Sequence, residues 1–174
     1  MMTIADIAGD GERGGNGTLL CVFESTESGM FSINRVISRD DGYTWGERRR
    51  VYTAAPRKSA GAPQVINVGG TLVVSFMTNE DVEMPGGASS VDGGQMKIVT
   101  SIDGGQTWST GGIGSKHGTS QKALAVVGGD REVHGELGGI HWPGLYRLDN
   151  DSFLVFYSRA GWAAGVSHKF KLAW

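Results

Sequence analysis

The sequence predicts an all-β protein, a β-propeller of four-stranded antiparallel blades with about three blades present. The eight-residue pattern S-x-D-x-G-x-T-W occurs twice, at residues 38–45 and 101–108. Short β-rich apolar runs alternate with Gly, Asn and Asp turns, and the chain has 29 Gly but only 4 Pro. This balance is typical of many short strands joined by tight turns.

The first repeat unit is expected at residues 3–52. The turn Asn16-Gly17 precedes an apolar run at residues 18–23, and a second strand-like run follows at residues 31–37. The pattern at residues 38–45 suits a tight turn, in which Asp accepts hydrogen bonds from backbone N–H groups and Gly adopts a positive φ. The Thr-Trp pair that ends the pattern is expected to restart the strand with a large apolar anchor.

The second unit is expected at residues 61–111 and has the same order of elements. Residues 63–68 and 71–76 form a hairpin around the turn Gly69-Gly70, which is the usual chemistry of a two-residue β-turn. A strand at residues 96–100 then leads into the second copy of the pattern. The repetition of hairpin, strand and turn indicates a repeated four-stranded sheet.

The stretch between the second and third units has a weaker pattern. A strand at residues 121–127 would complete the second blade or decorate the central face, and a short strand is expected around residues 132–134. The third unit, residues 140–174, repeats the hairpin with strands at residues 143–148 and 152–157, but it lacks the S-x-D-x-G-x-T-W pattern.

The number of units is too small for a closed propeller, because propellers usually close with about four to eight blades. Residues 1–174 are therefore interpreted as one partial β-propeller domain, about three blades of a presumed six. A fragment, a truncated gene product and a half propeller that assembles with a partner all stay open as explanations. Open blade edges would favour self-association.

Composition excludes several function classes. The formal net charge of −2 gives no electrostatic reason to expect nucleic acid or an anionic membrane as partner. No apolar run is long enough for a transmembrane helix, and residues 1–5 do not resemble a signal peptide. The single cysteine, Cys21, lies in an apolar run and is expected to be a buried free thiol. The four histidines lack metal-binding spacing, so neither a metal nor a cofactor is expected.

Glu24 is the candidate catalytic residue. It ends the apolar run of the first unit, at a position where the aligned hairpins carry Met77 and Ser158. A carboxylate at this strand exit could act as a glycosidase nucleophile or acid. A solvated carboxylate without a catalytic role is an equally weighted alternative. Glu80 and Asp81, which follow the second hairpin, could hold sugar hydroxyls, although acidic loop residues usually have no such role.

A third candidate region combines aromatic and cationic residues: His141, Trp142, Tyr146 and Arg147. Trp stacks on sugar rings, and Arg binds carboxylates bidentately. Packing within a blade is a strong alternative for Trp142 and Tyr146. Tyr146 and Arg147 are expected to point to opposite sides of their strand.

The repeated pattern is the Asp-box, whose defining positions here are Ser38, Asp40, Gly42 and Trp45, and then Ser101, Asp103, Gly105 and Trp108. From about residue 18 to residue 174 the chain resembles the sialidase-like β-propellers that carry this motif. Residues 61–81 resemble the fungal branch, glycoside hydrolase family 93. Its members are six-bladed exo-arabinanases that cut α-1,5-linked arabinan with retention.

The resemblance implies an extracellular protein that is part of a retaining exo-glycoside hydrolase, with an oligo- or polysaccharide as its partner. Retention requires two carboxyl groups, of which only Glu24 can be placed. An exo-α-sialidase is the alternative enzyme, with Arg35 and Arg147 as candidates for later members of its arginine triad. A non-catalytic Asp-box propeller that serves as a binding module is a further alternative.

Overall fold

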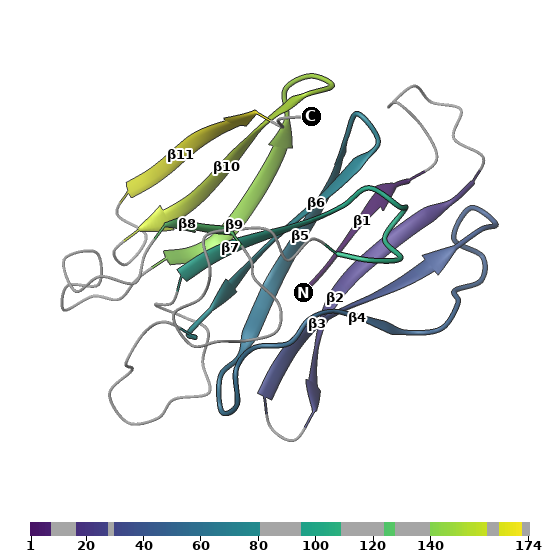
Figure 1. The fold of residues 1–174 in the computed structure, drawn as a ribbon, viewed down its shortest axis with the longest axis horizontal. Coiled ribbons are helices and arrows are strands. Elements are labelled where there is room, and N and C mark those ends of the chain that lie inside the picture. The colour runs from purple at the N-terminus through teal and green to yellow at the C-terminus, as the bar shows by residue number, and fades with distance from the viewer. Residues whose placement is uncertain are drawn as a thin grey trace.

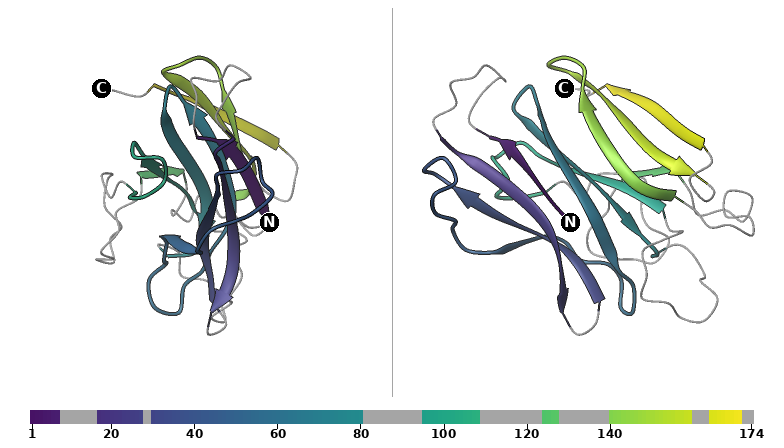
Figure 2. Two further views of the ribbon diagram at one scale, coloured as in Figure 1. Left: turned by 90° about the vertical axis from the view of Figure 1, so that its right-hand side faces the viewer. Right: turned by 180° about the vertical axis from the view of Figure 1, so that it is seen from behind.

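The structure, a computed structural model, describes residues 1–7, 17–27, 30–80, 95–108, 124–127, 140–159 and 164–171. All regular secondary structure in these residues is β-strand, which confirms the predicted all-β class. The strands form three antiparallel sheets. The sheets follow one another across the molecule in chain order, in the front view and from behind (Figures 1 and 2).

The first sheet corresponds to the predicted first unit. Its strands, in the order β1-β2-β3-β4, are β1 (Met2–Asp6), β2 (Leu19–Glu27), β3 (Met30–Ser38) and β4 (Arg49–Tyr52). The strands expected at residues 18–23 and 31–37 are therefore present, within β2 and β3. Cys21 is a buried free thiol, as predicted, and burial raises its pKa.

The second sheet is also four-stranded and contains the hairpin predicted around Gly69-Gly70. Its strands, in the order β5-β6-β7-β8, are β5 (Ala60–Val68), β6 (Thr71–Thr78), β7 (Gln95–Ser101) and β8 (Leu124–Val127). Strand β8 pairs with β7, so the strand expected at residues 121–127 completes this sheet. The short strand expected around residues 132–134 lies outside the described residues.

The third sheet has three strands in the described part of the chain. They are β9 (Ile140–Arg147), β10 (Ser152–Arg159) and β11 (Ala164–Lys171), in the order β11-β10-β9. The hairpin predicted for the third unit is thus formed by β9 and β10. The described sheets do not close into a ring (Figure 1), so the observed architecture is a succession of antiparallel sheets.

One local prediction is wrong: the Thr-Trp pair does not restart the strand. Strand β4 begins at Arg49, well after Trp45. The Gly46 N–H donates to the Ile37 carbonyl over 2.8 Å and closes the loop before the strand can begin. The tryptophan folds back over its own turn instead, since a Cβ added to Gly42 would lie 3.8 Å from the Trp45 ring.

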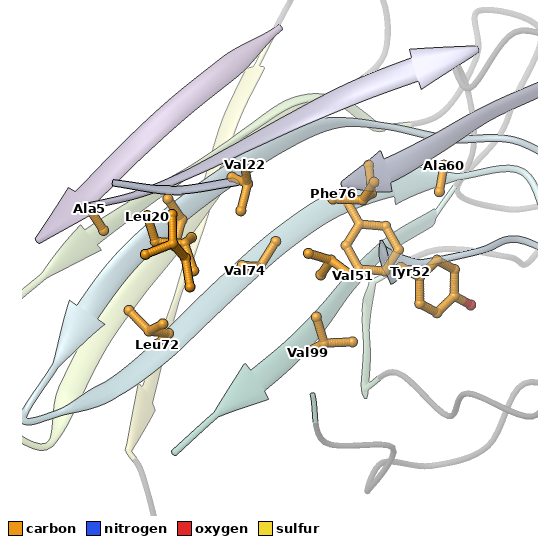
Figure 3. Packing of buried hydrophobic residues seen from close by; sticks show 13 residues of the cluster. Ala5, Leu20, Val22, Val51, Tyr52, Ala60, Leu72, Val74, Phe76 and Val99 are labelled. Atoms are coloured by element: carbon orange, nitrogen blue, oxygen red, sulfur yellow. The ribbon is translucent and has the colours of Figure 1, made fainter. Parts of the chain in front are cut away.

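The hydrophobic core lies between adjacent sheets. Leu20 and Val22 of β2 pack with Leu72, Val74 and Phe76 of β6 in one buried cluster (Figure 3). The opposite face of the second sheet, including Val73 and Ile98, packs with Phe153 and Val155 of β10. Strand β6 is therefore buried on both faces, which explains its nearly continuous apolar sequence.

The first strands of the sheets lie beside one another, since β5 contacts both β1 and β9. Two hydrogen bonds show that β1 and β5 run in the same direction. Thr3 Oγ1 donates to the Pro63 carbonyl over 3.5 Å, and Asn67 Nδ2 donates to the Asp6 carbonyl over 2.9 Å. Because β1 and β5 lie side by side and run in the same direction, the corresponding ends of the first and second sheets lie close together.

Candidate functional site

The two Asp-boxes form the predicted turns with nearly identical hydrogen bonds. In the second box Asp103 accepts from the Thr107 N–H at 2.9 Å and from Thr107 Oγ1–H at 2.5 Å. Ser101 Oγ–H donates to Asp103 at 2.7 Å, and Gly105 has a φ of 82°. Burial alone would raise the pKa of Asp103, but the bonds from Thr107, Ser101 and the Gln106 N–H together lower it to about 2.

The first box repeats this geometry, with Asp40 accepting from the Thr44 N–H at 2.8 Å and Gly42 at a φ of 88°. The bonds from Thr44 and Ser38 also lower the pKa of Asp40. The tryptophans differ in their surroundings, however. Trp108 packs against the core between the first two sheets, whereas Trp45 is 38% exposed.

The second Asp-box joins two sheets. Arg35, a buried residue of β3, donates from Nε to the Gly105 carbonyl over 3.0 Å and from Nη2 to Gln106 Oε1 over 3.4 Å. Burial and the neighbouring Arg49 lower the pKa of Arg35, and Asp103 and Glu47 act in the opposite direction. Arg35 is therefore committed to a contact between sheets, and this does not fit its suggested role in an arginine triad.

The turns and strand ends of the described residues gather at two opposite ends of the molecule. The Asp-box end carries both Asp-boxes, the Gly69-Gly70 turn and the turn at residues 149–151, because β3, β5, β7 and β9 all finish there. The opposite end carries Met1 and the segments around Glu24 and Glu80. The sequence-predicted residues are divided between these ends and do not form one cluster.

Glu24 lies on β2 near the end opposite the Asp-boxes. Its Oε1 is 2.8 Å from the Met1 ammonium, and its Oε2 accepts from the Ala62 N–H at 2.6 Å. The side chain is 26% exposed, so the carboxylate is held in place yet reaches solvent. Ala62 has a φ of 51°, in the left-handed region that favours glycine. This backbone conformation aims the Ala62 N–H at Glu24.

Glu80 has a different environment from the one expected. Its carboxylate is fully buried, pairs with Lys97 Nζ at 2.7 Å and accepts from the Tyr52 hydroxyl. Its Oε1 also accepts from the Ala55 N–H at 2.6 Å. Contact between Glu80 and a sugar does not fit this enclosure, because three protein donors surround the carboxylate. Asp81, its predicted companion, lies outside the described residues.

The buried group around Glu80 supports the loop at residues 53–59. Glu80 holds Ala55, and Asn79 Oδ1 accepts from the Ser59 N–H at 2.9 Å. This loop, with the ends of β3 and β4, lines a hollow of about 270 Å³. Its lining includes Arg50, Arg57 and Lys58.

The hollow is also lined by Phe31, Ser32 and Thr53. The Ser32 hydroxyl is buried and donates to the Ser25 carbonyl over 3.3 Å, so it is already bonded within the sheet. The volume of the hollow is slightly below the range of roughly 300–1,000 Å³ that is usual for ligand pockets, and this favours a small ligand such as a single sugar unit. The three cationic side chains favour a ligand with negative charge.

The third predicted region is divided along β9, with Tyr146 and Arg147 at the Asp-box end and His141 and Trp142 toward the other end. Tyr146 is 62% exposed, and Arg147 donates from Nε to the Asp149 carbonyl over 3.1 Å and from Nη2 to Asn150. These bonds make Arg147 part of the β9–β10 turn. His141 and Trp142 are placed on β9, but their side chains lie outside the described part of the structure.

Sequence reasoning missed Lys97, Tyr52 and the cationic loop residues. Lys97 had a usable signal, because a charged residue within the apolar run Met96–Val99 predicts a buried partner of opposite charge. Tyr52 and Arg57 had no comparable signal. Their importance comes from the packing of the loop at residues 53–59 on the second sheet.

The comparisons with known proteins do not assign the chain to a family. No protein-family model matches the sequence, and no curated protein matches it. The described residues contain no helix long and apolar enough to cross a membrane. They also contain no group of three or more His, Cys, Asp or Glu side chains arranged to hold a metal ion.

Proposed function

We propose that this chain forms blades of an Asp-box β-propeller and is part of a retaining exo-glycoside hydrolase acting on a plant polysaccharide such as α-1,5-arabinan. The observation that carries the proposal is the placement of Glu24. Its carboxylate is held but solvent-accessible, at the end of the sheets opposite the Asp-boxes. Propeller ligands bind at a mouth over the central axis, and Glu24 lies on β2, which pairs with the first strand β1.

Three features support a propeller arrangement of the sheets. Two complete meanders of four antiparallel strands follow each other in the chain. Their first strands, β1 and β5, lie side by side in parallel. The Asp-box of the second sheet contacts the first sheet, because Arg35 donates to the Gly105 carbonyl and Trp108 packs against the core between the two sheets. Radial repetition of four-stranded sheets is the defining feature of propellers.

Glu24 could supply one of the two carboxyl groups that a retaining glycosidase requires. In a retaining glycosidase one carboxylate attacks the anomeric carbon, and a second carboxyl group, about 5–5.5 Å away, first protonates the leaving oxygen and then activates water. The Ala62 N–H orients the Glu24 carboxylate at 2.6 Å, and such positioning favours an attacking role. Glu80 cannot be its companion because it is enclosed by Lys97 and Tyr52.

A second candidate function is recognition of an acidic sugar, as in an exo-α-sialidase or a non-catalytic binding module. The hollow beside the loop at residues 53–59 favours it, because Arg50, Arg57 and Lys58 line one small cavity. Arginine binds a sugar carboxylate bidentately, and an aromatic residue, Phe31, is among the lining residues. Neither Arg35 nor Arg147 lines this hollow.

The two functions are distinguished by a paired substrate assay. The protein is incubated with linear α-1,5-arabinan and with a sialyl-oligosaccharide, and released sugars are separated by anion-exchange chromatography. Release from arabinan, with the α-anomer formed first by proton NMR, supports the primary proposal. Release of sialic acid alone supports the second. Binding of an acidic sugar without turnover supports a binding module, and absence of both release and binding overturns both functions.

A further inference from the structure

Aligned positions in the second strand of each sheet point toward the same side of that sheet. In the second sheet Leu72, Val74 and Phe76 face the first sheet, and in the third sheet Phe153 and Val155 face the second. The aligned hairpin of the first sheet carries Leu19, Cys21 and Phe23 at these positions. Each sheet therefore presents one face toward the sheet before it in the chain and the other toward the sheet after it.

The first sheet has no sheet on one of these faces in the described part of the chain. This face, here the N-terminal face, carries Met2, Ile4, Cys21 and Phe23, since Met2 pairs with Phe23 and Ile4 pairs with Cys21. Met2 is 67% exposed and Ile4 is 52% exposed. An apolar strand surface of this kind marks a contact site.

The third sheet has no sheet packed on its opposite face in the described part of the chain. Its outward face, here the C-terminal face, carries Tyr146, Leu154 and Phe156, because Leu154 pairs with Tyr146. Phe156 is 46% exposed and lies over Gly144, where any added Cβ would overlap its ring. In the second sheet the residues aligned with Leu154 and Tyr146 are Val73, which belongs to the buried cluster against the third sheet, and Ile66, which is partly buried against that cluster.

We propose that the N-terminal face of one copy of this chain packs against the C-terminal face of a second copy. The two open faces are the two halves of the interface that the chain already forms twice, between its first and second and its second and third sheets. A second copy therefore continues an interface that the chain already forms between its own sheets.

The first Asp-box supports this arrangement. The second box seals the first sheet with Trp108, but the equivalent Trp45 is 38% exposed and Tyr43 is 88% exposed. In the proposed assembly the first box lies against the third sheet of the other copy, as the second box lies against the first sheet within one chain.

The contact is heterologous, because it joins two different faces of the chain. Such contacts form a closed ring only if the rotation from one copy to the next returns to the first copy. The described residues of two copies supply six sheets, within the range of about four to eight at which propellers close. Reciprocal packing would leave neither apolar face exposed. The proposal concerns assembly only and does not depend on the substrate.

The wild-type mass is the first test. Size-exclusion chromatography with light scattering, across a hundredfold range of concentration, is expected to show a species of twice the mass of one chain. A wild-type chain that stays monomeric at every concentration overturns the proposal. The proposal is then wrong even if a different polypeptide covers these faces.

Charged substitutions then locate the interface. Ile4→Glu and Phe156→Glu are each expected to weaken association at least tenfold. Ile102→Glu, a control at an 81% exposed position of the second Asp-box, leaves it unchanged. Circular dichroism and urea unfolding check that each variant is folded.

Mixing the two variants tests the head-to-tail geometry. A copy with Ile4→Glu keeps its C-terminal face, and a copy with Phe156→Glu keeps its N-terminal face, so the mixture recovers one intact interface and associates. If Phe156→Glu alone remains a full dimer, the contact joins two N-terminal faces and the head-to-tail proposal is wrong.

Discussion

Lys97 Nζ lies 2.7 Å from Glu80 Oε2, and the exposed fractions of these two side chains are 1% and 0%. The Tyr52 hydroxyl and the Ala55 N–H also donate to the Glu80 carboxylate. One buried carboxylate thereby ties β7, the end of β4 and the loop at residues 53–59 together. A buried charge of this kind is tolerated only when it is paired and hydrogen-bonded.

Breaking this ion pair is expected to destabilise the fold strongly. Glu80→Gln or Lys97→Met leaves one buried charge without its partner, at a cost of about 3–5 kcal/mol. The double variant is expected to lose less than the sum of the single losses, because neither charge remains. Urea unfolding measures each free energy, and Glu47→Gln, in an exposed pair with Arg49, is the control with little effect. Additive losses would contradict this coupling.

The equivalent glycines of the two Asp-boxes are expected to differ in their tolerance of alanine. Gly42 and Gly105 have φ values of 88° and 82°, so both substitutions incur strain of roughly 1–2 kcal/mol. At Gly105 the new Cβ also overlaps Leu20 Cδ1, whereas at Gly42 the nearest atom is 3.5 Å away. Overpacking should add about 1–3 kcal/mol at Gly105. Equal unfolding free energies for the two variants would show that Gly105 is not packed tightly against Leu20 of the first sheet.

Acid should weaken the second Asp-box. The pKa of Asp103 is about 2 in the folded protein, below its ordinary value of 3.8. A lowered folded pKa gives stabilisation that is complete above the unfolded value and is lost as the pH falls from about 4 through about 2. Asp103→Asn should therefore be less stable than wild type near neutral pH, and the difference should shrink in acid. A difference in urea midpoint that stays constant between about pH 6 and about pH 2 would argue against this linkage.

Glu24→Gln should abolish most turnover of arabinan. Loss of a positioned general acid or base typically reduces the rate by about 10²–10⁴-fold, and loss of a nucleophile is expected to reduce it at least as much. Glutamine keeps the shape and the bond from the Ala62 N–H, so the Michaelis constant and the urea midpoint should change little. Initial rates on linear arabinan provide the measurement, with Glu47→Gln, in the exposed loop between β3 and β4, as a matched control. Turnover within a few-fold of wild type would remove Glu24 from the mechanism.

Arg57 provides a test of the cationic hollow that is separate from stability. Its φ of 64° lies in the left-handed region, so Arg57→Gly removes the charge and relieves strain together. The acidic-sugar function predicts at least tenfold weaker binding of a uronic or sialic acid by calorimetry, with unfolding stability maintained or raised. Unchanged affinity in a folded variant would exclude the hollow as the binding site.

Much of the fold could be predicted from local chemistry. The Asp-box turns, the hairpin at Gly69-Gly70 and the burial of Cys21 all follow from short stretches of sequence, and the structure confirms them. The position of β4 could not be predicted, because the Gly46 N–H bond to Ile37 closes the loop late. The candidate site was predicted less well, since Glu80 faces Lys97 and Tyr52 rather than solvent.

Local sequence specifies the strands, their turns and the repeat that relates one sheet to the next. These properties depend on neighbouring residues, through side-chain alternation and the φ requirements of glycine turns. Which carboxylates reach solvent depends instead on how the sheets pack together. Glu24 and Glu80 follow similar apolar runs, but one is held beside Ala62 and the other is enclosed between two sheets. Burial depends on partners from distant parts of the chain, and no local pattern specifies them.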